Sequence, residues 1–416
     1  MKRYFEVILL ILVIGFVAVA KTKQNNQAPY IIMVSFDGFR HDYVEMYNPP
    51  NFKSFIDNGV AAEAMIPSYP SKTFPNHYTM VTGLYPDNHG LVDNSFYDKT
   101  LDLQYSIGNR EIVENPAFYD GLPLWQLVQQ NGMKSASYFW VGSEAPIGGD
   151  FPDYYTIYDG SVPNENRIDQ IIDWLKLPRS ERPNFITLYF SLVDSQGHSS
   201  GPDHPKTKQS VLEADRLLGK LKEQADQLDL PVNIIVVSDH GMEPIYPKKE
   251  NYIDVSSIKE KLEGSDIRMV NNGTHAHFYL GENDDEDQLI QELKVDARDF
   301  EVYRKSELPE HLNYGTNHRI GDVMMIMEPG HYISSSSRIK NNIENNITRG
   351  EHGFDPYATK HLGAIFYANG PDFKKGLKID KFENIHIYPM IAKLLGIKNY
   401  PKIDGKRTVL NDILTK

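Results

Sequence analysis

The chain has 416 residues, a formal net charge of −13 and no cysteine. This length exceeds that of one small core and fits a single large α/β domain that carries an insertion. The acidic balance argues against a broad electrostatic surface for long nucleic acids, and the lack of cysteine excludes disulfides, thiolate metal ligands and a cysteine nucleophile.

The N-terminus has the three-part pattern of a secretory signal, with basic residues at positions 2 and 3, an apolar run over 7–20 and a polar stretch from Lys21. The run is shorter than the roughly 20 residues that span a bilayer. We therefore expect residues 1–20 to be a cleaved signal peptide that leaves no stable membrane anchor, with a retained helix as the alternative. Because export without disulfides fits a bacterial periplasm better than a eukaryotic secretory route, a periplasmic or secreted protein of bacterial origin is expected.

Residues 21–29 form a polar linker, and the main domain is expected over 30–416. Within it, each of three apolar runs is followed by a side chain that can bind a metal: 30–36 by Asp37, 186–193 by Asp194, and 233–238 by Asp239 and His240. Helical patterns such as 209–228 lie between the runs and predict βα crossovers in a parallel sheet. Residues 135–140 and 364–368 are further candidate strands. Ligands of such sheets gather at the carboxyl ends of the strands.

The chain between the third run and His352 has a different pattern. Residues 275–280 and 323–329 predict strands and residues 286–293 predict a helix, so we interpret about 265–330 as an inserted α+β subdomain. Residues 333–347, rich in serine and asparagine, predict a surface loop. The expected fold class is therefore α/β, with a mostly parallel sheet flanked by helices and an inserted α+β subdomain.

Carboxylates and imidazoles without sulfur are ligands that suit zinc. One aspartate after a strand is usually a turn residue or a helix cap, but here several candidates occur together. We expect Gly197 to let a loop fold back so that Asp194 and His198 face one cation. Six such groups divide naturally between two cations, and a cation pair can stabilise the attacking and leaving oxygens of an in-line displacement at phosphorus.

Thr73 is the candidate nucleophile beside these ligands. It precedes an apolar stretch that ends at Gly83, with Pro75 in the first turn, so it is expected at a helix N-terminus. Backbone amides and the helix dipole there favour an alkoxide and a phosphoryl anion. The alternative is that Thr73 simply caps the helix.

Together these motifs closely resemble the nucleotide pyrophosphatase/phosphodiesterase family of the alkaline phosphatase superfamily. The matching stretches follow the family's order at 34–39, 72–77, 81–86, 194–198, 238–242 and 352–353. The resemblance implies an alkaline phosphatase-like fold and two Zn²⁺ ions. It implies that one ion is held by Asp194, His198 and His352, and the other by Asp37, Thr73, Asp239 and His240.

The resemblance also implies a substrate site. Asn94 would help Thr73 and the zinc ions to hold the phosphoryl oxygens. Phe74 and Tyr155 would clamp a base, with Trp140 and Asp153 in the pocket wall, although Trp140 fits a core position equally well. Lys72 is either a phosphate contact or a solvated lysine.

The activity implied is hydrolysis of small nucleotide diesters or pyrophosphates, which releases nucleoside 5′-monophosphates through a covalent intermediate on Thr73. A phosphomonoesterase is disfavoured, because no arginine follows Thr73 closely to grip a dianionic phosphate. The alternatives are a phosphodiesterase for lysophospholipid or choline phosphodiesters, and a non-catalytic metal- or nucleotide-binding relative. We expect no stable nucleic-acid complex, and no protein partner can be inferred.

Overall fold

The computed structural model describes residues 28–295 and 298–415. The predicted signal peptide, residues 1–20, and residues 21–27 of the predicted linker lie outside the described residues. In the part of the chain that is described, no helix combines the length and apolar character needed to cross a membrane.

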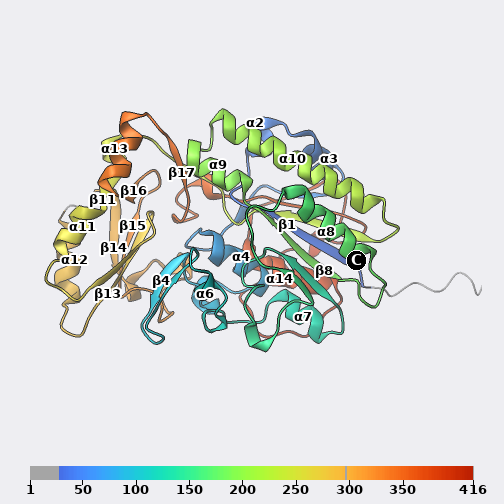
Figure 1. Ribbon diagram of the computed structural model, residues 1–416, viewed down its shortest axis with the longest axis horizontal. Helices are drawn as coiled ribbons and strands as arrows, with labels where there is room; N and C mark the ends of the chain where they lie inside the picture. Colours follow the sequence, from blue (N-terminus) through green and yellow to red (C-terminus); the bar gives the residue numbers. More distant parts are fainter. Residues whose placement is uncertain (1–27, 296–297, 416) are drawn as a thin grey trace, which may run out of the picture.

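An eight-stranded sheet forms the centre of the main body (Figure 1). β1 (Tyr30–Phe36) lies in the middle, parallel to β8 (Phe185–Phe190) on one side and to β9 (Val232–Val237) on the other. All seven residues of β1 are buried, which explains its continuous apolar sequence. Beyond β8 lie β6 (Ser135–Tyr138) and β7 (Tyr154–Thr156), and beyond β9 lie β18 (Phe366–Asn369), β2 (Val60–Ala62) and β19 (Leu377–Ile379).

Among these eight strands, β18 runs antiparallel to both of its neighbours, and every other pair is parallel. The sheet is therefore mostly parallel, as predicted. The carboxyl ends of β1, β8 and β9 lie at one edge of it because the three strands are adjacent and point the same way.

Helices cover both faces of the sheet (Figure 1). Alternate residues of β1 point to opposite sides, so Ile31 and Met33 belong to one apolar core and Ile32 and Val34 to the other. The first core is completed by α4 (Thr73–Thr82), α7 (Leu124–Gln130) and α14 (Ile387–Leu394). The second is completed by α2 (Tyr43–Tyr47), α3 (Pro50–Asp57), α8 (Asn164–Lys176) and α10 (Pro205–Asp226).

A four-stranded antiparallel sheet lies at one end of the molecule (Figure 1). Its order is β12 (Arg268–Asn271), β13 (His275–Tyr279), β15 (Val323–Met327) and β14 (Phe300–Arg304). α11 (Val255–Lys261) and α12 (Glu286–Lys294) share its apolar core. We call this unit the peripheral sheet. It includes the two strands and the helix predicted for the insertion, whereas β12 and β14 were not predicted.

Two local predictions are wrong. Residues 333–347 are not a surface loop, because they include β16 (Tyr332–Ser334) and α13 (Ser336–Glu344). The serine run is compatible with this helix because Ser335 is its N-cap, where its hydroxyl accepts a hydrogen bond from the Arg338 N–H. The strand predicted at 186–193 ends early at Phe190, and the chain continues as α9 (Leu192–Ser200).

Short elements complete the chain. The helices α5 (Pro86–His89) and α6 (Arg110–Val113) follow α4. Four two-stranded sheets pair β4 (Ser95–Asp98) with β5 (Leu103–Ser106), β10 (Glu243–Ile245) with β17 (Arg349–Glu351), β11 (Tyr252–Asp254) with β16, and β3 (Met65–Ile66) with β20 (Phe382–Glu383). The hairpin of β4 and β5 places Asn94 directly before a strand, and β17 leads into His352.

Candidate active site

Three aspartates converge at the carboxyl edge of the main sheet. Asp37 follows β1, Asp194 lies in the first turn of α9, and Asp239 follows β9 by one residue. Each has a buried carboxylate oxygen that has no hydrogen-bond partner: Asp37 Oδ1, Asp194 Oδ1 and Asp239 Oδ2. Buried carboxylates repel one another and require compensating positive charge.

Helix α9 brings Asp194 and His198 together. The two residues are four positions apart and therefore share one face of the helix, with His198 Nε2 3.3 Å from Asp194 Oδ1. The expectation that Gly197 folds a loop back is thus wrong. Its lack of a side chain instead makes room for Met242, since a Cβ at Gly197 would lie 2.8 Å from the Met242 Cε.

Three histidines are held in the same tautomer. In each, Nδ1 lies within hydrogen-bond distance of a backbone carbonyl: His198 with Gly350 O at 2.7 Å, His240 with Gly241 O at 2.8 Å, and His352 with Ser71 O at 2.8 Å. A carbonyl oxygen can only accept, so Nδ1 carries the proton and donates it. A ring that carries only this proton offers the lone pair on Nε2, as metal-binding histidines do.

The Nε2 atoms point at the carboxylates. His352 Nε2 is 3.7 Å from Asp194 Oδ1, and His240 Nε2 is 3.0 Å from Asp239 Oδ2 and 3.5 Å from Asp37 Oδ1. Asp194, His198 and His352 form one group that could hold a metal ion, and Asp37, Asp194 and His240 form an adjoining one. The structure thus brings together all seven predicted metal-contacting residues, which we call the candidate metal cluster: Asp37, Thr73, Asp194, His198, Asp239, His240 and His352.

The electrostatics of this cluster fit divalent cations. Burial and the neighbouring carboxylates of Asp239 and Asp194 raise the pKa of Asp37 well above its ordinary value. Burial and the proximity of His240 hold the pKa of His352 well below its ordinary value, so this ring is neutral. Bound cations would offset the repulsion between the carboxylates around Asp37, and the His352 ring would serve as a ligand. A set of nitrogen and oxygen donors suits zinc.

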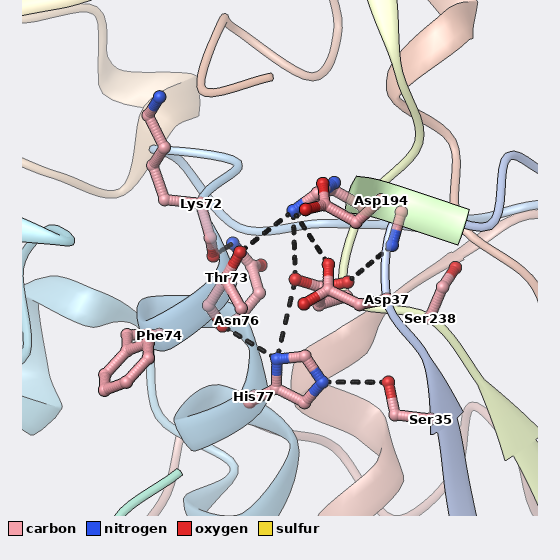
Figure 2. A network of polar contacts seen from close by, with 12 residues as sticks. Ser35, Asp37, Lys72, Thr73, Phe74, Asn76, His77, Asp194 and Ser238 are labelled. Carbon is pink, nitrogen blue, oxygen red and sulfur yellow. Dashed lines mark hydrogen bonds and ion pairs between the residues drawn. The ribbon is translucent and has the colours of Figure 1, made fainter. Parts of the chain in front are cut away.

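Thr73 is the first residue of α4, and its side chain faces the cluster (Figure 2). Its Oγ1 lies 3.3 Å from His240 Nε2. Lys72 occupies the N-cap position with extended backbone angles, and Pro75 lies in the first turn. Thr73 is therefore not the N-cap of α4, because Lys72 occupies that position.

Two residues that support the cluster were not identified from the sequence. His77, four residues after Thr73 on α4, donates from Nδ1 to the Thr73 carbonyl at 2.9 Å, and its Nε2 meets the Ser35 hydroxyl at 2.8 Å (Figure 2). Tyr189 donates to Asp37 Oδ2 at 2.6 Å. His77 could have been identified by its helical spacing of four residues from Thr73. Tyr189 could have been identified as a polar ring within a buried apolar strand.

Asn94 and Lys72 have different surroundings. The Asn94 side-chain oxygen accepts the Phe74 N–H at 2.9 Å, so the asparagine lies at the N-terminus of α4 and its NH₂ group remains as a donor. Lys72 is buried and donates from Nζ to the Asn272 carbonyl at 3.0 Å. It points away from Asp37 and Asp194, and burial lowers its pKa (Figure 2). The structure therefore places Lys72 inside the protein rather than in solvent, and a contact of Lys72 with phosphate stays a prediction.

A cavity of about 380 Å³ opens beside Asp37, Thr73 and Asp194. Phe74 and Trp140, two of the residues predicted for the base pocket, line it, although Trp140 is also buried and its Nε1 donates to the His77 carbonyl at 3.0 Å. The remaining lining residues include Ile107, Arg110, Val113, Phe139, Glu144, Tyr158 and Tyr189. A larger cavity of about 910 Å³ between α3 and α10 contains no predicted site residue.

Asp153 and Tyr155 are not brought to the smaller cavity. Asp153 is bound to Lys134 Nζ at 2.6 Å and to the Ser135 N–H at 3.0 Å. Tyr155 stacks on Phe151 with ring centroids 4.7 Å apart. The strand β7 directs Tyr155 away, and the chain that follows brings Tyr158 to the cavity instead.

Two charged residues in the cavity wall were also missed. Arg110 forms an ion pair with Glu144, and Glu144 Oε1 accepts the Tyr158 N–H at 3.0 Å. Arg110 also reaches Glu114 at 3.1 Å. An arginine 37 positions after Thr73 gave no local motif, and only the fold brings it to the cavity wall.

Residues 31–355 match the family model described as type I phosphodiesterase / nucleotide pyrophosphatase. A venom phosphodiesterase of Macrovipera lebetinus is 37% identical over 398 residues, which are 94% of this chain and 45% of that protein. Ectonucleotide pyrophosphatase/phosphodiesterase family member 3 of Bos taurus is 36% identical over 395 residues, which are 93% of this chain and 44% of that protein. The chain thus spans slightly less than half the length of these relatives.

These relatives correct the prediction of origin. The expectation of a bacterial periplasmic protein, which was based on the missing cysteines, is wrong, because it is overturned by similar proteins from Macrovipera lebetinus, Bos taurus and Mus musculus, which are animals. A chain without cysteine cannot form disulfides, and this does not identify the source.

The structure resembles murine ectonucleotide pyrophosphatase/phosphodiesterase 5, solved as an inactive threonine-to-alanine variant in complex with AMP. The TM-score is 0.85 at 30% identity, over 93% of this chain and 100% of that chain. The human protein of the same name gives a TM-score of 0.85 at 29% identity. These matches confirm the predicted alkaline phosphatase-like α/β fold. The chain belongs to the type I phosphodiesterase / nucleotide pyrophosphatase family.

Proposed function

We propose that the protein is a zinc-dependent phosphodiesterase that cleaves nucleotide diesters or pyrophosphates and releases nucleoside 5′-monophosphates. One observation carries the proposal: the Thr73 hydroxyl, at the N-terminus of α4, lies 3.3 Å from His240 Nε2 beside three carboxylates that have oxygens without donors. A hydroxyl in such a place is suited to attack phosphorus.

Asp194, His198 and His352 would hold one zinc ion, and Asp37, Asp239, His240 and Thr73 the other. When bound, the pair supplies positive charge that lowers the pKa of the Thr73 hydroxyl and of the leaving oxygen. The protein's contribution is orientation: the carbonyls of Gly350, Gly241 and Ser71 fix the ligand tautomers.

The reaction would proceed in two displacements at phosphorus. The Thr73 hydroxyl loses its proton to solvent and its Oγ1 forms a bond to phosphorus while the bond to the leaving oxygen breaks, and the leaving group acquires a proton from solvent. Water then loses a proton and attacks the phosphorus of the nucleotidyl-threonine, the bond to Oγ1 breaks, Oγ1 regains a proton, and the nucleoside 5′-monophosphate is released. The Thr73 N–H and the NH₂ group of Asn94 would donate to the phosphoryl oxygens, because the Phe74 N–H is bound to the Asn94 side chain, Pro75 has no N–H, and the Asn76 N–H is bound to the Lys72 carbonyl.

The cavity of about 380 Å³ supports a nucleoside as the group attached to the phosphoryl. Phe74 and Tyr158 offer aromatic faces for a base, and Arg110 with Glu144 offers charged groups for its polar edge. The AMP complex of the murine relative agrees with this substrate class.

The test compares thymidine 5′-p-nitrophenyl phosphate, p-nitrophenyl phosphate and glycerophosphocholine as substrates for zinc-loaded protein. We expect kcat/KM to be highest for the nucleotide ester, with thymidine 5′-monophosphate as the product. Faster turnover of glycerophosphocholine than of the nucleotide ester would show that choline phosphodiesters, not nucleotides, are the substrate class. No turnover by protein that carries two zinc equivalents would favour a non-catalytic relative.

A further inference from the structure

Residues 272–277, which lead from β12 into β13 of the peripheral sheet, contact three loops of the candidate active site. The Asn272 carbonyl accepts from Lys72, the neighbour of Thr73. The Thr274 hydroxyl lies 3.4 Å from the His352 carbonyl and 3.1 Å from His275 Nδ1. His275 and His277 both contact Asp93, the neighbour of Asn94.

The contact with Asp93 is wholly buried. Asp93, His275 and His277 each have no exposed surface. Asp93 Oδ2 accepts from Nε2 of both histidines, at 3.0 Å for His277, and Asp93 Oδ1 accepts the N–H of Asn94 at 2.7 Å. Burial would raise the pKa of Asp93, but the two histidines hold it below its ordinary value. The carboxylate is therefore ionised and accepts three hydrogen bonds.

The tautomer of His277 is determined by a backbone N–H that lies just before β15. The Gly321 N–H, just before β15, donates to His277 Nδ1 at 3.1 Å. Because Nδ1 accepts, the proton of the neutral ring is on Nε2, the atom that faces Asp93. His277 Nε2 therefore donates a hydrogen bond to Asp93 and has no lone pair to offer a metal ion. The three side chains are nevertheless close enough together to hold a cation.

Asn94 is fixed from both sides as a result. Its N–H is bound to Asp93, and its side-chain oxygen accepts the N–H of Phe74, directly after Thr73. Its carbonyl also accepts the Ile107 N–H at 3.1 Å. The side-chain NH₂ therefore has a defined position relative to the nucleophile.

We infer that Asp93, His275 and His277 are positioning residues, which hold the Asn94 amide in place for the phosphoryl group. The peripheral sheet thus takes part in the reaction without contacting the reacting atoms. The inference rests on the proposed function, because Asn94 has this task only in a phosphoryl-transfer site.

A double-mutant cycle with Asn94 tests the inference on the nucleotide ester. His277→Leu should lower kcat by about tenfold and leave KM within about twofold, since a displaced donor weakens transition-state binding more than substrate binding. His277→Gln, which retains an N–H donor, should restore most of the loss. In an Asn94→Ala background, His277→Leu should cause no further loss, because the group that it positions is already absent.

His386→Leu is the matched control. His386 is also buried, and its Nδ1 accepts the Lys406 N–H at 3.0 Å, but it has no contact with Asp93. It should lower the melting temperature and leave kcat unchanged. If the losses of His277→Leu and Asn94→Ala multiply, or if His386→Leu lowers kcat as much as His277→Leu, the role of His277 is only structural and the inference is overturned.

Two measurements do not depend on turnover. Selective ¹⁵N-histidine labelling should show His277 protonated at Nε2, and a third zinc equivalent that disappears in His277→Gln would overturn the inference. If the wild type binds two zinc ions but hydrolyses no diester, the proposed function fails. AMP affinity then decides the inference: His277→Leu and Asn94→Ala should weaken AMP binding without additivity, and additive losses would reject it.

Discussion

The protonation of the candidate metal cluster is determined by backbone atoms that are far away in the sequence. His352 donates to Ser71, 281 positions earlier, and His198 donates to Gly350, 152 positions later. A motif read from the sequence names the ligands but not these acceptors, because the acceptors are carbonyls that any residue could provide. The residue types were therefore predictable, whereas the tautomers required the fold.

Replacement of Thr73 tests the nucleophile. Thr73→Ala should lower kcat by a factor on the order of 10³ or more, because no oxygen remains to attack, while the fold and most bound zinc are retained. Thr73→Ser should keep measurable activity. Since two in-line displacements each invert phosphorus, a chiral thiophosphate diester should be hydrolysed with retained configuration. Net inversion would mean that water attacks phosphorus directly.

Tyr158 and Tyr155 form a matched pair for the base site. Tyr158→Ala should raise KM for nucleotide diesters about 5- to 150-fold, the equivalent of about 1 to 3 kcal/mol of stacking. Tyr155→Ala should change it little, because Tyr155 stacks on Phe151 outside the cavity. A small aryl diester, which needs little stacking, should be hydrolysed at nearly the wild-type rate by both variants. Equal effects of both changes on nucleotide kinetics would contradict this assignment.

At the scale of elements, apolar runs were the dependable signal. The first predicted strand, 30–36, coincides with β1, because its residues are buried on both faces. Prediction was weakest where polar side chains form the structure: α13 begins with serines and buries Asn342, and α9 contains Gly197. Local composition there resembles a loop, and the helix is stabilised by capping and by contacts that only the fold supplies.

The placement of Tyr155 shows a second limit at this scale. Residues 154–158 contain three tyrosines, and the strand β7 covers only Tyr154–Thr156. Where the strand ends decides which ring faces the cavity. A one-dimensional pattern does not locate that end closely enough, because strand boundaries depend on pairing with β6.

The cap of α13 can be tested by substitution. Ser335→Ala should lower the free energy of unfolding by about 1 kcal/mol, because the Arg338 N–H loses its acceptor. Urea denaturation measures this change. Ser337→Ala, at the second residue of the same helix, is the control and should lower the free energy of unfolding by less. If both variants unfold at the wild-type midpoint, Ser335 does not stabilise this helix.

At the scale of the whole molecule, the candidate metal cluster joins segments that are far apart in the chain. Its residues come from α4, α9 and the loops after β1, β9 and β17, and they span positions 37 to 352. The peripheral sheet adds residues 272–277 to the same centre. Such a centre cannot form until most of the domain has folded, so metal binding and global stability should be coupled.

Metal removal tests this coupling and the assignment of ligands together. Chelation should abolish turnover and lower the melting temperature, because the neighbouring carboxylates of Asp37, Asp194 and Asp239 would then repel one another without compensation. Wild-type protein should carry close to two zinc equivalents. His352→Ala should chiefly empty one site and Asp239→Ala the other, so each variant should retain about one equivalent by elemental analysis. Tyr155→Ala, which lies outside the cluster, should retain both. Full activity in stripped protein without added metal, or an unchanged melting temperature after chelation, would show that the fold and the reaction do not depend on the cations.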